Sequence, residues 1–196
     1  MPDGGLLIKT LYLSVDPHMR GCMTGLANYY IPQFELADPL FSMGVGEVLE
    51  SRDPAFSVGD LVLGELDWSP AMVWDPAKTS DRVVGGILQP IVPGAIAPSH
   101  YLGALGTTGI TAFFGVLAVA QPQPGETFLV SSAASGVGSI AGQIAKLRGA
   151  HVYGLTSTKE KRDVLTQRLD FVEALDYRSP TLADELRESM PTGPDI

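Results

Sequence analysis

The sequence predicts an α/β protein in two parts, a β-rich first part and a second part built on a parallel sheet. Residues 1–104 contain short, non-repeating stretches of β-forming residues separated by proline, glycine and aspartate. In residues 105–196, strand-like runs alternate with amphipathic segments at the spacing of βαβ crossovers. The chain has 196 residues, 45% of them hydrophobic, which suffices for one large domain or two modest ones.

The first part is predicted to consist mainly of strands. The stretch LLIKTLYLS opens it, and FSMGVGEVLE follows with glycines that indicate bulges or bends. The expected strands are residues 6–14, 41–50, 58–64, 71–74 and 87–92. The last two lie in a segment rich in proline, glycine and aspartate, which favours short and irregular strands.

The second part is predicted to begin with a helix within 106–119, after Gly109, and a strand at 128–131. The next helix is expected to end at Gly149, a residue type typical of C-caps. Its expected core face holds Val137, Ile140, Ala141, Ile144 and Ala145.

Two further strand–helix pairs are expected beyond Gly149. Strands are predicted at 151–155 and 171–175. Ser157 with Glu160 has the spacing of a capping box, and Ser179 followed by Pro180 is typical of another helix start. Asp195 and Ile196 resemble the opening of a fourth strand.

Composition narrows the classes of function. The formal net charge of −9 argues against nucleic acid as a partner, because no basic stripe is present to neutralise phosphates. Cys22 is the only cysteine, so neither an internal disulfide nor a multi-cysteine zinc site can form. No signal-peptide pattern and no apolar run of about 18 residues is present. We therefore expect a cytoplasmic protein that does not bind membranes.

Small residues follow the strand at 128–131, as in a nucleotide-binding βαβ unit. The loop comprises Ser132, Ala133, Ala134, Ser135, Gly136, Val137 and Gly138. Such residues let the backbone approach a pyrophosphate at a helix N-terminus. The alternative is that they only permit close packing of strand and helix. A literal G-x-G-x-x-A match at Gly136, Gly138 and Ala141 does not decide between the two.

The end of the strand at 151–155 indicates which dinucleotide would bind. An NAD site usually places Asp or Glu there to bond the ribose 2′-hydroxyl. This chain instead has Thr156, Ser157 and Thr158 followed by Lys159 and Lys161. Hydroxyls and lysines suit a 2′-phosphate, so NADP(H) is favoured. The alternative is an ordinary solvated helix start with two surface lysines.

Three stretches carry a family resemblance: LYLSVDPHMRGCM at 11–23, LGALGTTGITAFFGVL at 102–117, and 127–161. They resemble the zinc-free medium-chain dehydrogenase/reductases, most closely the prostaglandin reductase (leukotriene B4 12-hydroxydehydrogenase) branch with its double-bond reductases. The resemblance implies a partial GroES-like catalytic domain followed by the first half of a Rossmann domain. It also implies NADPH-dependent reduction of the C=C bond of a small enone or enal.

The resemblance assigns roles residue by residue. The loop Ser132–Gly138 would cradle the pyrophosphate, with Ser157, Lys161 and Tyr177 near the adenosine 2′-phosphate. The remaining matches are Thr108, Gly109 and Thr111, which would line the nicotinamide side, and Asp16, His18 and Arg20, which would face the cleft from the catalytic domain.

Three positions depart from the family's pattern. His18 stands where the family usually has tyrosine; it would either donate a proton to a developing enolate or be an exposed loop histidine. Ser135 replaces the middle glycine of the A-x-x-G-x-x-G loop, with Gly136 beside it. Ser42 stands where zinc-dependent relatives carry a histidine, so we expect no metal.

Family members begin with strands before the position of Met1 and continue well past that of Ile196. The resemblance therefore leads us to expect a truncated form that binds cofactor weakly and has little or no activity alone. The competing hypothesis is a non-catalytic interaction module that pairs through the exposed edge of the strand at 128–131. A homodimer is compatible with either hypothesis.

Overall fold

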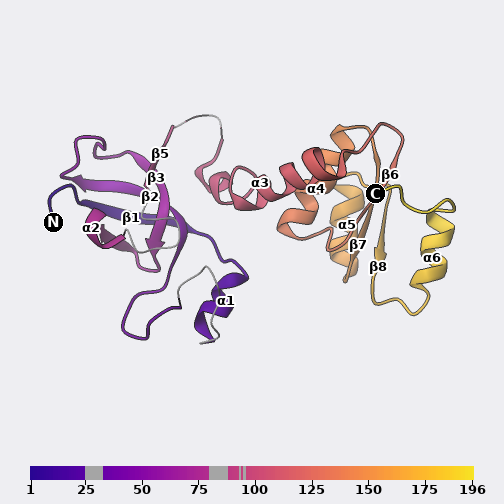
Figure 1. Cartoon of the computed structure of the whole chain (residues 1–196), viewed down its shortest axis with the longest axis horizontal. Coiled ribbons are helices and arrows are strands. Elements are labelled where there is room, and N and C mark those ends of the chain that lie inside the picture. The colour runs from indigo at the N-terminus through magenta and orange to yellow at the C-terminus, as the bar shows by residue number, and fades with distance from the viewer. Residues whose placement is uncertain (25–32, 80–87, 93, 95) are drawn as a thin grey trace. The chain divides into compact units, whose positions relative to one another are not determined.

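The computed structural model describes residues 1–24, 33–79, 88–92, 94 and 96–196. The chain separates into two compact units, Met1–Leu102 and Gly103–Ile196 (Figure 1). Each unit has a hydrophobic core of its own. Within the described residues, no helix combines the length and apolarity needed to cross a membrane.

The first unit contains a five-stranded antiparallel sheet with the order β4-β1-β2-β3-β5. Its strands are β1 (Leu6–Leu13), β2 (Phe41–Ser51), β3 (Leu61–Asp67), β4 (Ala71–Trp74) and β5 (Gln89–Ile91). The five predicted strands are therefore confirmed, with shifted bounds for β3 and β5; residue 87, which we had included, lies outside the described residues. The irregularity expected around β2 is confirmed by two register shifts in its pairing with β1.

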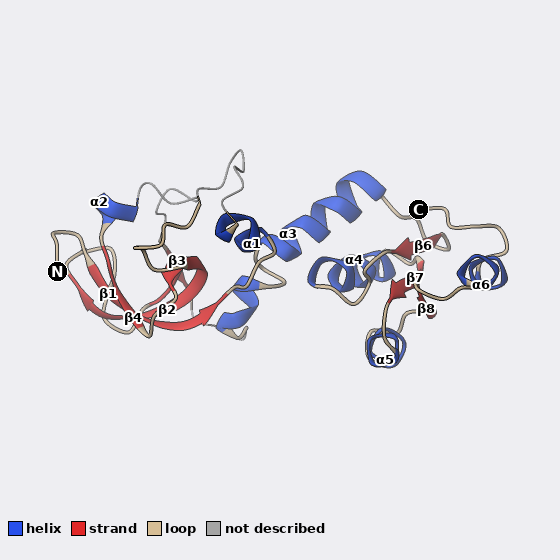
Figure 2. Cartoon of the chain, turned by 90° about the horizontal axis from the view of Figure 1, so that it is seen from below, coloured by secondary structure: helices blue, strands red, loops and turns tan. Residues whose placement is uncertain are grey.

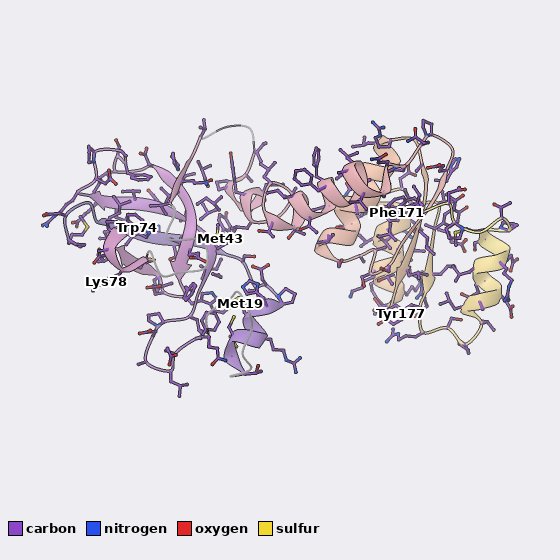
Figure 3. The ribbon with its side chains drawn as sticks, viewed as in Figure 1. Met19, Met43, Trp74, Lys78, Phe171 and Tyr177 are labelled. Carbon is purple, nitrogen blue, oxygen red and sulfur yellow. The ribbon has the colours of Figure 1, made fainter. Side chains whose placement is uncertain are left out.

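The core of the first unit lies on one face of this sheet. Leu6 and Ile8 of β1 and Val48 of β2 are fully buried, and Trp74 of β4 packs with them (Figure 3). Among its described residues, the unit also contains three short helical segments: α1 (His18–Met23), α2 (Pro76–Thr79) and the 3₁₀ segment η1 (Pro98–Leu102). The sequence analysis did not predict them, because segments this short show no clear helical periodicity.

The second unit contains a parallel sheet with the order β6-β7-β8, as the βαβ spacing predicted. Its strands are β6 (Thr127–Val130), β7 (His151–Thr156) and β8 (Glu173–Asp176). Its helices are α3 (Thr107–Phe114), the π-helical segment η2 (Gly115–Ala120), α4 (Gly136–Leu147), α5 (Lys159–Gln167) and α6 (Leu182–Ser189). Helices α4 and α5 lie on one face of the sheet and α6 on the other (Figure 2).

The predicted core face of α4 is confirmed at Ala145, which is buried, and at Ala141 and Ile144, which pack against the core, but it is wrong at Val137. Val137 is 39% exposed, whereas Gly138, Gly142 and Ala145 are buried. A methyl group added at Gly142 would lie 2.1 Å from Cζ of Phe171. The ring of Phe171 thus occupies the space above Gly142. Phe171 belongs to the core of this unit. It precedes β8, which begins at Glu173 and not at residue 171 as predicted.

Three predicted helix starts in the second unit are wrong by one to three residues. Helix α3 begins at Thr107, before Gly109. Helix α5 is capped by Thr158 rather than Ser157, since the Thr158 hydroxyl accepts the Lys161 N–H (3.3 Å). Helix α6 begins at Leu182, with Ser179 three residues before it. The C-cap of α4 is Arg148, and Gly149 follows it with a φ of +89°, so Gly149 ends the helix as predicted but from the position after the cap.

The C-terminal residues lie along the outer side of β6. The Leu129 N–H donates to the Ile196 carbonyl, and the Asp195 N–H to the Thr127 carbonyl, both at 2.9 Å. The Asp195 carboxylate also accepts the Thr127 N–H (2.8 Å). Part of the edge that we expected to be exposed is therefore hydrogen-bonded.

The close contact between Gly142 and Phe171 yields a test of the packing. Gly142→Ala is expected to destabilise the protein by about 1–3 kcal/mol, because the buried Phe171 ring leaves no room for a methyl group. Gly115→Ala is the matched control: its added methyl group would meet no atom within 4 Å in a helical backbone. We expect Gly115→Ala to be neutral or to stabilise by about 0.4–1 kcal/mol. Urea denaturation of both variants measures the difference, and equal effects would contradict the packing described here.

Candidate functional site

Three hydrogen bonds fix the conformation of the loop between β6 and α4. The buried Ala133 donates its N–H to the Leu155 carbonyl of β7 (2.9 Å), which ties the loop to the sheet. Ser132 has a φ of +48°, and its carbonyl accepts the Ser135 N–H (2.8 Å). Ser135 is the N-cap of α4, because its hydroxyl accepts the Gly138 N–H (3.2 Å). The chain therefore turns sharply into the helix within a few residues.

The backbone angles explain how Ser135 can replace a glycine. Its φ of −84° and ψ of 173° are extended, a conformation open to any residue. Gly138 is the residue that needs to lack a side chain, since an added methyl group would lie 2.4 Å from the Ser132 carbonyl oxygen. Close packing of loop and helix thus accounts for Gly138. It also brings the first amide groups of α4, which have no partner within the helix, beside the end of β6.

Helix α3 lies against this loop. A methyl group added at Gly136 would lie 2.9 Å from Cγ2 of Thr108, so these two residues are in contact. Gly109 is buried, and an added methyl group there would overlap the Ala104 carbonyl at 1.8 Å. The Thr111 hydroxyl donates to the Thr107 carbonyl within the helix (2.7 Å). The structure therefore brings Thr108 against the loop and Thr111 beside it, whereas Gly109 of the same helix packs on Ala104.

A hollow of about 450 Å³ opens between α3, β6 and the loop. Its walls are mostly apolar, and its polar rim comes from Thr111, Ser131, Ser132 and Ser135. Val137, which the sequence analysis placed in the core, lines this hollow instead. The hollow lies directly beside the start of α4, where an anion would be stabilised by the helix dipole.

A second polar group lies at the carboxyl ends of β7 and β8. Thr156 pairs with Asp176 across the parallel strands, and the Tyr177 N–H donates to the Thr156 carbonyl (3.2 Å). Ser157 and Tyr177 therefore lie near each other although 20 residues separate them. Tyr177 is 53% exposed, and the Lys161 side chain in the first turn of α5 is also exposed.

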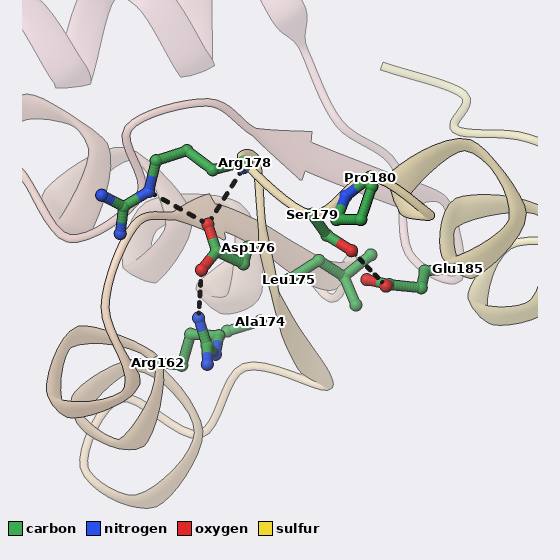
Figure 4. A pocket seen from close by; sticks show the side chains of 8 residues that line it. All are labelled: Arg162, Ala174, Leu175, Asp176, Arg178, Ser179, Pro180 and Glu185. Carbon is green, nitrogen blue, oxygen red and sulfur yellow. Dashed lines mark hydrogen bonds and ion pairs between the residues drawn. The ribbon is translucent and has the colours of Figure 1, made fainter.

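Asp176 connects two arginines that the sequence analysis did not single out (Figure 4). Its carboxylate accepts Nη1 of Arg162 (3.1 Å) and the backbone N–H of Arg178 (3.0 Å), and Nε of Arg178 lies 3.5 Å away. The Arg178 backbone N–H is the main cause that holds the pKa of Asp176 below its ordinary value of 3.8, and Arg162 adds to the effect. The signal that could have found this group is an acidic residue ending a strand with an arginine two residues later.

The three proposed catalytic residues lie in the first unit, around α1. His18 and Arg20 are exposed, and Asp16, just before the helix, is half-buried. Its carbonyl accepts the Met19 N–H (3.1 Å), which fixes the start of α1. Within the described ranges, no hydrogen bond or ion pair joins the side chains of these three residues.

The position that carries histidine in zinc-dependent relatives has a structural partner here. Ser42 is buried in β2, and its hydroxyl accepts Nε1–H of Trp68 (3.0 Å). Across the described residues, no group of three or more His, Cys, Asp or Glu side chains is arranged to hold a metal ion.

The hydroxyl of Ser135 yields a test of the loop. Ser135→Ala is expected to lower the free energy of unfolding by about 1 kcal/mol, because the Gly138 N–H loses its acceptor. Ser135→Gly is expected to cost only a few tenths of a kcal/mol, since glycine is itself a tolerated N-cap. Chemical denaturation compares the two; a glycine variant as unstable as the alanine variant would contradict the capping role.

The sequence of this chain is similar to those of known oxidoreductases. Residues 1–81 match the domain family described as the N-terminal domain of oxidoreductase. The chain is 38% identical, over its whole length, to the NADP-dependent 2-alkenal reductase of Nicotiana tabacum, and covers 56% of it. It is 36% identical to prostaglandin reductase 1 of Bos taurus, again over its whole length, and covers 55% of it. The chain thus spans about half the length of the curated relatives it matches.

A solved structure of a similar protein has the same fold as this chain. CurA from Vibrio vulnificus, crystallised in complex with NADPH, superimposes on all of this chain with a TM-score of 0.85 and 31% identity, and the match covers 55% of CurA. The predicted combination of a GroES-like antiparallel unit and a partial Rossmann unit is confirmed. The homologues of this chain are NADP-dependent oxidoreductases of the medium-chain dehydrogenase/reductase family, prostaglandin and alkenal reductases among them.

Proposed function

We propose that the protein is an NADPH-dependent oxidoreductase that reduces the C=C bond of small enones or enals. The observation that carries the proposal is that one unit contains both the Ser132–Gly138 loop and, at the ends of β7 and β8, a second group of residues that includes Arg162 and Arg178. The relatives support the class of substrate: the similar proteins are named for an alkenal and a prostaglandin, and CurA binds NADPH.

The residues present fit a dinucleotide. The first amide groups of α4, those of Gly136 and Val137, lack acceptors within the helix and can bind a pyrophosphate. Gly138 holds this helix end close to the loop. The strand β7 ends at Thr156 and is followed by Ser157, so no acidic side chain stands at the position where an NAD site bonds the ribose 2′-hydroxyl. Lys161 and Tyr177 are both exposed and free to contact it.

The bound cofactor would supply the hydride, and the chain's own residues would position the reactants. Thr108, Gly109 and Thr111 would line the nicotinamide side, with Gly109 leaving space for the Ala104 carbonyl at the first turn of α3. Asp16, His18 and Arg20 would act from the first unit. The exposed imidazole of His18 would hold the proton that quenches the enolate oxygen of the substrate. Its exposure is also what a histidine without a chemical role would show.

The alternative, an interaction module that pairs through β6, has less support. The backbone groups of Thr127 and Leu129 on that edge already pair with Asp195 and Ile196. A partner strand would have to displace these bonds before it could pair along the full edge.

The direct test is a titration of the purified chain with NADPH, followed by the cofactor's fluorescence, with NADH as the comparison. We expect saturable binding that favours NADPH. Lys161→Ala is expected to weaken NADPH binding about tenfold, the effect of removing a charge-assisted hydrogen bond, and to leave NADH binding nearly unchanged. Lys78→Ala, in α2 of the first unit, is the control. A folded chain that binds neither dinucleotide, or binds both equally, would refute the proposal.

A further inference from the structure

Arg178 bridges the ends of two neighbouring strands. It lies two residues beyond the end of β8, and its Nη2 donates to the carbonyl of Ser157, the residue that follows β7. Its guanidinium carbon also lies 5.8 Å from the centre of the Tyr177 ring. One side chain therefore reaches the edge of the sheet where a dinucleotide fold reads the ribose 2′-substituent.

We propose that Arg178 binds the 2′-phosphate of NADP(H) and determines the preference for it over NAD(H). This inference rests on the proposed function, and it assigns a specificity role to a residue outside the set derived from the sequence. Arginine suits the role because its planar fork can hold two phosphate oxygens at once.

The Arg178 guanidinium is held in place by its contacts, but some of its N–H groups remain available to a ligand. Its Nε faces Asp176 at 3.5 Å, and its Nη2 bonds Ser157. Within the described part of the chain, Nη1 makes no hydrogen bond, and the side chain is 59% exposed. At least two N–H groups therefore remain for a ligand on an anchored side chain. An anchored arginine loses less conformational entropy when it binds than a mobile one.

The surrounding charges favour an anion. Asp176 is shared by Arg162 and Arg178, so one carboxylate faces two guanidinium groups, and Lys161 adds a further cation. Glu185 lines the same pocket, and its carboxylate accepts the hydroxyls of Ser179 (2.6 Å) and Thr181 (2.7 Å). In Figure 4 the guanidinium of Arg178 lies on the side of Asp176 away from Glu185.

The test uses two ligands that differ only in the phosphate concerned, adenosine 2′,5′-bisphosphate and adenosine 5′-monophosphate, measured by isothermal titration calorimetry on the full chain. We expect Arg178→Ala to weaken binding of the bisphosphate about tenfold or more and binding of the monophosphate less than twofold. Arg168→Ala, an exposed arginine at the end of α5, removes the same charge and is expected to change neither.

Arg178→Lys keeps the charge and loses the fork, so an intermediate loss of bisphosphate binding is expected, and it serves as the second variant if the alanine variant fails to fold. Equal weakening of both ligands by Arg178→Ala would mean that the residue only orders the Ser157 segment, which overturns the inference. A bisphosphate preference that is undiminished in both Arg178 variants would also overturn it, while the proposed function stands. If the unaltered chain shows no preference at all, the proposed function fails first.

Discussion

The close approach of the α4 N-terminus to β6 and α3 is the constraint on which the rest of the second unit depends. Three positions in this contact have no room for a side chain: added methyl groups would lie 2.4 Å from an atom at Gly138, 2.9 Å at Gly136 and 1.8 Å at Gly109. Gly138 and Gly136 thus let the loop, the helix start and α3 meet in one place, and Gly109 lets the first turn of α3 pack on the Ala104 carbonyl. The same absence of side chains leaves backbone amide groups as the chemical surface of the loop, which is what an anionic group needs. Packing and binding are thus two consequences of one arrangement.

The second determinant is the register of the parallel sheet. Because Thr156 pairs with Asp176, the segments that leave β7 and β8 emerge side by side. A hydroxyl-rich turn and a Tyr-Arg pair, distant in the sequence, thereby face a common edge. Asp176 then connects the two segments through Arg162 of α5 and through Arg178. A one-residue slip of β8 would turn Asp176 to the other face of the sheet and separate the basic side chains from the end of β7.

Sequence patterns predicted the strands of both sheets and the parallel order of the second, because alternation and βαβ spacing are local and regular. They failed where a local choice depends on distant packing. Ser157 and Thr158 are both competent caps, and the geometry of the chain leaving β7 selected Thr158. Phe171 has strong β propensity, but its ring packs against Gly142 in the core of the unit. Arg178 carried no local signal for its contact with Ser157, which only the strand register creates. Ser135 is the opposite case, since a departure from a family pattern proved to be an ordinary N-cap.

The central claim is that one unit holds both the pyrophosphate and the 2′-phosphate of NADP(H), at two separate groups of residues. Hydrogen–deuterium exchange with mass spectrometry tests it most directly, because exchange reports on each segment separately. NADPH is expected to slow exchange in Ser132–Gly138 and in the two segments that follow β7 and β8, whereas NADH slows only Ser132–Gly138, with β2 as the internal reference. Slower exchange confined to other segments, or the same pattern with both dinucleotides, would contradict the account.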